Sequence, residues 1–120
     1  MEESPIFSSC KQNASFAGVL DIDPRELLQK CDQVFIADVR QPDEFSGELG
    51  HIPGAKLFVL DRLPEHLPTF PKDKPIVFVC RSGGRSAKAS AYALESGFAK
   101  VFNLEGGMLA WNELHFTIEK

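Results

Sequence analysis

Two nearly continuous apolar runs constrain the fold of this chain more than any other feature. They read Val34-Phe35-Ile36-Ala37-Asp38-Val39 and Pro75-Ile76-Val77-Phe78-Val79, without the alternation of a half-exposed strand. Such runs are typical of strands that are covered on both faces, as in parallel sheets. Further extended segments are expected at residues 18–22, 55–60 and 100–104. The pattern therefore predicts a mainly parallel central sheet.

Helical segments are expected between these strands. Asp23 is a suitable N-cap, with Pro24 at the first helical position and Glu26 three residues after the cap. The clearest helix spans residues 86–96 and ends before Gly97. Shorter helices are predicted from Pro42, over residues 107–114, and at most once within the proline-rich residues 63–75. Alternating strands and helices indicate an α/β domain.

Composition limits the class of protein and its partners. The chain has 120 residues, of which 43% are hydrophobic and 25% charged, as in an ordinary globular domain. Its net charge of −4 argues against nucleic acid or an anionic membrane as a partner, because both need a basic face. No apolar run has the ~20 residues of a membrane span. Residues 1–15 lack the order of a secretory signal, so a cytoplasmic location is predicted.

The chain divides into three parts by pattern. Residues 1–15 are polar and without periodicity, so a flexible N-terminal segment is expected there. A single domain is predicted over residues 16–116, followed by a short C-terminal tail at 117–120.

The three cysteines are Cys10, Cys31 and Cys80. Their number is odd, there is no C-x-x-C pair, and no histidines stand at metal-ligand spacing. Neither a disulfide framework nor a metal site is expected, and no cofactor is expected. Free thiols are predicted, so the surroundings of each cysteine decide its role.

Cys80 stands where an α/β sheet binds its ligands. It follows the most apolar strand, and ligands bind at the carboxyl ends of such strands. A helix begins soon after, so its first N–H groups and the positive end of its dipole point toward the loop. Gly83 and Gly84 permit a tight loop, and Arg81 and Arg85 add positive charge. The loop therefore predicts an anion site centred on sulfur, which favours a thiolate.

A buried cysteine at the end of a strand is often only a small apolar filler. The two arginines and the double glycine within five residues of Cys80 favour a functional thiol instead. Cys10 and Cys31 have no such surroundings, so we expect them to be bystanders.

Several short motifs, in their order and spacing, resemble the single-domain rhodaneses. The matching pieces are Asp38-Val39-Arg40, Glu44-Phe45, Gly50-His51-Ile52-Pro53-Gly54-Ala55, the loop from Cys80 to Ser86, Leu104-Glu105-Gly106-Gly107, and Trp111. Together they span most of residues 16–114. The resemblance implies a three-layer rhodanese-like α/β domain, with a five-stranded, mainly parallel sheet and helices on both faces. It also implies transfer of a sulfane sulfur through a persulfide on a catalytic cysteine.

The resemblance assigns roles to individual residues. Cys80 matches the catalytic cysteine. The loop that surrounds the persulfide matches Arg81, Ser82, Gly83, Gly84, Arg85 and Ser86. Asp38 and Arg40 match a structural turn, in which we expect Arg40 to pair with Glu44. The setting of His51 indicates a histidine that braces a turn through a hydrogen bond rather than a general base.

The implied partners are small molecules. The donor would be thiosulfate, a polysulfide or a persulfide, and the acceptor a thiol, cyanide or an acceptor protein. Two alternatives remain. A cysteine phosphatase is disfavoured because its loop is C-x5-R, whereas Arg85 comes only five positions after Cys80 and the loop has no acidic residue. A non-catalytic interaction module would typically have lost the cysteine, which this chain retains.

Overall fold

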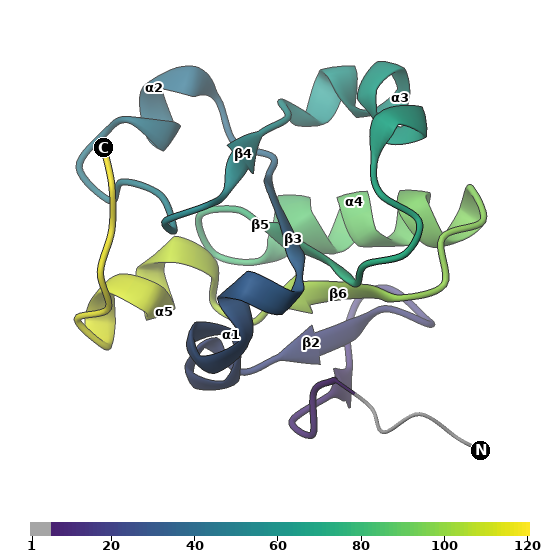
Figure 1. Ribbon diagram of the computed structural model, residues 1–120, viewed down its shortest axis with the longest axis horizontal. Coiled ribbons are helices and arrows are strands. Elements are labelled where there is room, and N and C mark those ends of the chain that lie inside the picture. Colours follow the sequence, from purple (N-terminus) through teal and green to yellow (C-terminus); the bar gives the residue numbers. More distant parts are fainter. Residues whose placement is uncertain (1–5) are drawn as a thin grey trace.

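The computed structural model describes residues 6–120. Its six-stranded sheet has the order β1-β2-β6-β5-β3-β4, and all neighbouring pairs are parallel except β1 with β2 (Figure 1). The strands are β1 Lys11–Gln12, β2 Leu20–Ile22, β3 Phe35–Asp38, β4 Lys56–Leu57, β5 Ile76–Val79 and β6 Val101–Leu104. The predicted five-stranded parallel sheet is confirmed, and β1 adds a sixth strand at its edge.

Helices cover both faces of the sheet. They are α1 Pro24–Lys30, α2 Pro42–Phe45, α3 Leu63–His66, α4 Gly84–Glu95 and α5 Gly107–Glu113, with 3-10 turns at Cys31–Gln33, Leu60–Arg62 and Leu67–Thr69. The side chains of β5 alternate between two cores. Val77 and Val79 pack in the core that includes residues of α1 and α5, whereas Ile76 and Phe78 pack in the core that includes residues of α3 and α4. This alternation explains why the sequence of β5 is apolar throughout.

Two predicted elements have different lengths in the structure. The extended segment expected at residues 55–60 forms a ladder only at Lys56–Leu57, because the chain turns into a 3-10 helix at Leu60. Helix α4 begins at Gly84 rather than at residue 86. It therefore starts two residues nearer to Cys80 than predicted.

The N-terminal segment contacts the domain from residue 6 onward, and the flexible segment expected at 1–15 stays a prediction. Phe7 is only 1% exposed, and Lys11–Gln12 pairs with β2. The backbone N–H and hydroxyl groups of Ser8 and Ser9 donate to the carboxylate of Glu26 at 2.6–2.9 Å. Residues 1–5 of the expected segment lie outside the described residues.

The start of α1 is as predicted in one respect and different in another. Asp23 is the N-cap, and its carboxylate accepts the N–H of Arg25 at 2.8 Å. Glu26 was expected to complete this cap, but its carboxylate is occupied by Ser8 and Ser9. Glu26 therefore fastens the N-terminal segment to the helix instead.

The C-terminal residues also contact the domain. The backbone groups of His51 and Glu119 exchange two hydrogen bonds, at 2.8 and 2.9 Å. The indole N–H of Trp111 donates to the carbonyl oxygen of Thr117 at 3.0 Å. The division of the chain at residues 16 and 116 stays a prediction. Among residues 6–120, no helix is long and apolar enough to cross a bilayer.

Candidate functional site

Cys80 lies directly after β5, with only 1% of its surface exposed. The residues 81–83 form a loop, and Gly83 is the N-cap of α4 with φ of 110°. Glycine adopts this left-handed conformation without steric cost. The N–H of Gly83 then donates to the sulfur of Cys80 at 3.1 Å. The loop thus supplies a backbone donor to the sulfur.

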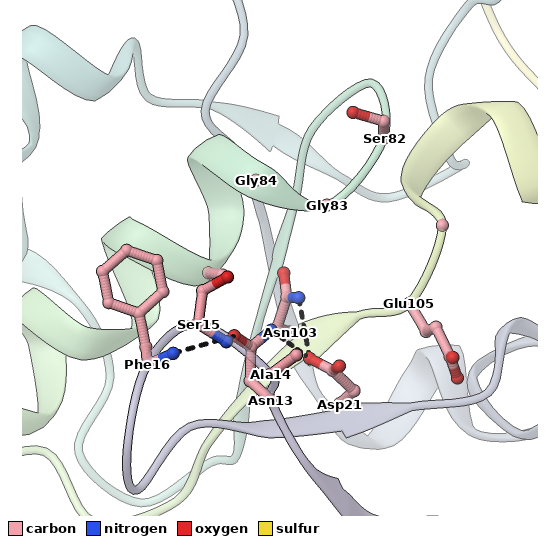
Figure 2. Close-up of a pocket in the computed structure, with 12 residues that line it drawn as sticks. Asn13, Ala14, Ser15, Phe16, Asp21, Ser82, Gly83, Gly84, Asn103 and Glu105 are labelled. Carbon is pink, nitrogen blue, oxygen red and sulfur yellow. Dashed lines mark hydrogen bonds between the residues drawn. The ribbon is translucent and has the colours of Figure 1, made fainter.

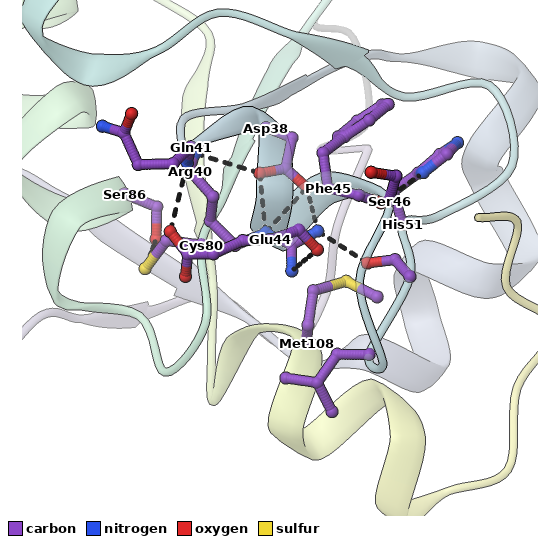
Figure 3. A network of polar contacts seen from close by, with 12 residues as sticks. Asp38, Arg40, Gln41, Glu44, Phe45, Ser46, His51, Cys80, Ser86 and Met108 are labelled. Atoms are coloured by element: carbon purple, nitrogen blue, oxygen red, sulfur yellow. Dashed lines mark hydrogen bonds and ion pairs between the residues drawn. The ribbon is translucent and has the colours of Figure 1, made fainter.

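The sulfur has a second polar neighbour, the buried hydroxyl of Ser86 (Figure 3). Its oxygen lies 3.2 Å from Sγ of Cys80 and 2.5 Å from Oδ1 of Asn103. The side-chain amide of Asn103 donates to Oδ1 of Asp21 at 2.9 Å, and Asn13 donates to the same oxygen at 2.9 Å (Figure 2). A polar chain therefore runs from the thiol beneath the loop to β2. No pattern in the sequence indicates this chain of contacts, because single polar residues in strands carry no motif.

The N-terminus of α5 holds the Cys80 loop from the other side. The N–H groups of Met108 and Leu109 donate to the carbonyl oxygens of Cys80 and Arg81 at 2.9 and 3.0 Å. Gly107 makes this approach possible, because a Cβ there would overlap both carbonyl oxygens. Its φ of 55° also favours glycine. The sequence pointed to this glycine only as part of the family resemblance, without a role.

Arg85 is paired with Glu44. Its two terminal nitrogens donate to the two carboxylate oxygens of Glu44 at 2.7 and 2.8 Å. This hydrogen bonding lowers the pKa of Glu44 to about 2, although partial burial opposes the shift. The same contact raises the pKa of Arg85. The expected positive charge of Arg85 is present near the thiol, but it is balanced by a carboxylate.

Arg40 does not form the predicted ion pair with Glu44. Its guanidinium instead binds the carboxylate of Asp38, with contacts of 2.7 and 2.9 Å, and both side chains are buried (Figure 3). Two further N–H groups of Arg40 donate to backbone carbonyl oxygens, at 2.6 Å to Gly50 and at 3.2 Å to Glu44. Arg40 therefore fixes the segment after β3 through its backbone, which leaves the Glu44 carboxylate for Arg85.

His51 lies in the turn where it was expected to act as a brace. Its Nδ1 is 2.8 Å from the carbonyl oxygen of Phe45, and its ring stacks on the Phe45 ring with centroids 3.7 Å apart. These contacts fit a positioning role for the imidazole within this turn.

Within residues 6–120, two cavities flank the Cys80 loop. One, of about 260 Å³, lies beside Ser82, Gly83 and Gly84 and has Asp21 and Asn103 in its lining (Figure 2). The other, of about 370 Å³, is lined by residues that include Arg40, Glu44 and the exposed Arg81. Both are large enough for a small anion or thiol.

The other two thiols lie in different surroundings. Cys10 and Cys31 are partly buried and free. Burial raises the pKa of both thiols, and the nearby carboxylates of Glu26 and Asp32, respectively, add to the effect. These surroundings favour unreactive, protonated thiols.

Comparison with known proteins agrees with the motifs. The sequence model of the rhodanese-like domain family matches residues 23–114. A curated protein named sulfurtransferase, from Allochromatium vinosum, is 38% identical over 96 residues, which cover 78% of this chain and 88% of that protein. The thiosulfate sulfurtransferase GlpE from Pseudoalteromonas translucida is 38% identical over 86 residues, covering 72% and 79% of the two chains. The crystal structure of a rhodanese-like domain protein from Staphylococcus aureus is 38% identical, with a TM-score of 0.69, and the match covers 83% of this chain and 98% of that one. The chain therefore belongs to the rhodanese-like domain family.

Proposed function

We propose that this protein is a sulfurtransferase that carries a sulfane sulfur as a persulfide on Cys80. The observation that carries the proposal is the position of the thiol. It lies at the carboxyl end of β5, with the Gly83 N–H at 3.1 Å and the Ser86 hydroxyl at 3.2 Å from the sulfur. Donors placed in this way stabilise a sulfur anion. The relatives named as sulfurtransferases support the same chemistry.

The reaction proceeds in two displacements. The Cys80 thiolate attacks the outer sulfur of thiosulfate, or the sulfane sulfur of a persulfide or polysulfide. A bond from Sγ to that sulfur forms, the S–S bond of the donor breaks, and sulfite or a thiolate leaves with the electron pair. Cyanide or a thiolate then attacks the outer sulfur of the Cys80 persulfide. The Sγ–S bond breaks, and the Cys80 thiolate is regenerated, so ping-pong kinetics are expected.

The loop from Arg81 to Ser86 would hold the persulfide and the donor. Arg81 is exposed at the rim of a cavity beside this loop, where its charge would attract a dianion. Arg85 would act mainly through Glu44, because its guanidinium is already engaged. Asp38, Arg40 and His51 would support the site by fixing the segment after β3.

The proposed partners are thus a small sulfane donor and a thiol, cyanide or protein acceptor. The free thiols favour a reducing compartment, and we propose the cytoplasm. The alternative is an interaction module without catalysis, and mass spectrometry distinguishes it from a sulfurtransferase.

Intact-protein mass spectrometry tests the proposal. Wild type treated with thiosulfate should gain one sulfur, about 32 Da, and lose it on addition of cyanide. Cys80→Ser should gain nothing, whereas Cys31→Ser should behave as wild type. If no sulfane donor forms an adduct on the folded wild type, or if Cys80→Ser still forms one, the proposed function is wrong.

A further inference from the structure

The hydroxyl of Ser86 lies between two acceptors but has a single proton to donate. Its oxygen is 3.2 Å from the sulfur of Cys80 and 2.5 Å from Oδ1 of Asn103. Ser86 is fully buried, and Asn103 is 2% exposed. With so little exposed surface, both side chains depend mainly on protein partners for their hydrogen bonds, so the sulfur and the amide oxygen compete for one proton.

The orientation of the Asn103 amide is fixed from the far side. Its Nδ2 donates to Oδ1 of Asp21 at 2.9 Å, and Asp21 also accepts the Nδ2 of Asn13. A carboxylate only accepts hydrogen bonds, so Asn103 must turn its NH2 group to Asp21 and its oxygen to Ser86. Asn103 is thereby held as a constant acceptor for the Ser86 proton.

We propose that Asn103 is a positioning residue that controls whether the Ser86 proton is offered to Cys80. While the thiol is protonated, its S–H donates to the Ser86 oxygen, and the Ser86 O–H donates to Asn103. When a base from solvent removes the thiol proton, the electron pair stays on the sulfur. The Ser86 hydroxyl then rotates toward the thiolate without breaking its O–H bond, and Oδ1 of Asn103 loses this donor. Because Asn103 competes for the Ser86 proton, it weakens the hydrogen bond from Ser86 that stabilises the thiolate.

In the two-step reaction proposed above, the Ser86 hydroxyl would rotate twice per turnover, once in each direction. The thiolate has a full charge on Sγ before attack, whereas in the persulfide the charge lies on the outer sulfur. The Ser86 O–H would turn to Asn103 once the Sγ–S bond forms, and would turn to the sulfur again when the acceptor regenerates the thiolate. This part of the inference rests on the proposed function, but the competition for the proton does not.

Substitution of Asn103 by another neutral side chain changes the donors to the sulfur and neither adds nor removes a charged side chain near it. The charged groups near the thiol come from the loop, from α4, from the end of β3, from α2 and from β2, whose Asp21 is linked to the thiol through Asn103. They are Arg81, Arg85, Asp38, Arg40, Glu44 and Asp21. Helix α5 packs on the loop through the N–H groups of Met108 and Leu109, which are neutral.

The test is the pH dependence of Cys80 alkylation by iodoacetamide, with Cys10 and Cys31 replaced by serine. Asn103→Leu removes the competing acceptor at nearly constant size. The pH of half-maximal alkylation should fall by about one unit, since a thiolate that keeps a full hydrogen bond is favoured by roughly this amount. A profile that coincides with wild type, or lies at higher pH, overturns the proposal.

Three further variants make the result specific to the Ser86 proton. In a Ser86→Ala background, Asn103→Leu should have no effect on the profile, and an undiminished shift there would overturn the proposal. Asn103→Ala gives the same test with a side chain that cannot clash, should the leucine variant fail to fold by circular dichroism. Ser90→Ala is the matched control, because this buried hydroxyl, one turn along α4, donates to the carbonyl oxygen of Ser86 at 2.8 Å. Alkylation needs no sulfur donor, so its outcome is independent of the persulfide experiment.

Discussion

The carboxylate of Glu44 and the guanidinium of Arg85 form two hydrogen bonds, of 2.7 and 2.8 Å, across 41 positions of the sequence. Glu44 belongs to α2, which follows β3, and Arg85 belongs to α4, which follows β5. These strands are neighbours in the sheet. The contact therefore ties together the two segments that leave the carboxyl edge of the sheet, one of which contains the thiol.

Glu44→Gln should destabilise the protein modestly. Glutamine keeps the size of the side chain but loses the charge and one of the two acceptor oxygens, so the paired contact cannot form. Both side chains are partly exposed, at 27% and 37%, so we expect a loss of about 1 kcal/mol in the free energy of unfolding. Urea unfolding measures it. Glu65→Gln is the control, because the Glu65–Arg62 pair is largely exposed and should contribute less. Equal losses in the two variants would contradict the structural role of Glu44.

The same contact should make stability depend on pH in a defined window. The pKa of Glu44 falls from its usual 4.5 to about 2 in the folded protein, because the carboxylate binds Arg85. A carboxyl group with a lowered folded pKa stabilises the protein fully above its unfolded pKa, and this contribution is lost as the pH falls to the folded value. The difference in unfolding free energy between wild type and Glu44→Gln should therefore be constant above pH 5 or so. It should shrink steadily between the two pKa values, and a difference that instead grew toward low pH would refute the assignment.

Gly107→Ala should disturb the Cys80 loop. The added Cβ would overlap the carbonyl oxygens of Cys80 and Arg81, so α5 must move away from the loop. We expect a loss of about 2–3 kcal/mol in unfolding free energy, from lost hydrogen bonds and backbone strain together. Sulfur transfer from thiosulfate to cyanide, measured as thiocyanate, should fall as well.

Gly97→Ala separates the effect of backbone strain from the effect of the lost hydrogen bonds to the Cys80 loop. Gly97 also has a positive φ, of 102°, but a Cβ there would meet no atom within 4 Å. This variant should lose only the cost of the backbone strain, about 1 kcal/mol, and keep its activity. If both variants were equally impaired in transfer, the contact of Gly107 with the loop would not explain the effect.

Cys10→Ser and Cys31→Ser should leave sulfur transfer within about twofold of wild type. Burial raises the pKa of both thiols, so few of them are ionised near neutral pH. Titration with iodoacetamide at pH 7, followed by peptide mass spectrometry, should label these two cysteines slowly. Rapid labelling of Cys31, or loss of transfer in Cys31→Ser, would indicate a redox role for that residue instead.

The sequence predicted those parts of the fold that depend on local pattern. The apolar runs of β3 and β5, the Asp23 cap and the glycine-rich loop after Cys80 all occur where they were expected. Each of these signals lies within about ten residues, and burial on both faces makes the strands easy to recognise. The position of Cys80 followed from the same local signals.

Contacts between distant segments were harder to predict. Arg40 and Glu44 have the spacing of a helical ion pair, but Gln41 is the N-cap of α2, so Arg40 lies outside the helix and takes Asp38 instead. Glu26 has the spacing of a capping box, yet its carboxylate is taken by serines 17 and 18 positions away. The expected partner Glu44 instead binds Arg85, 41 positions away, and the Glu26 carboxylate binds serines that only the folded chain brings near.

The short strand β1 has a consequence for association between molecules. Strands that end a sheet expose unpaired N–H and C=O groups, to which another chain can add. In this protein β1 pairs antiparallel with β2, and the opposite edge, β4, has only two residues in the ladder. Neither border of the sheet therefore offers a long template for another strand. We therefore expect the N-terminal segment, held by Glu26 and by the burial of Phe7, to protect the domain against edge-to-edge aggregation.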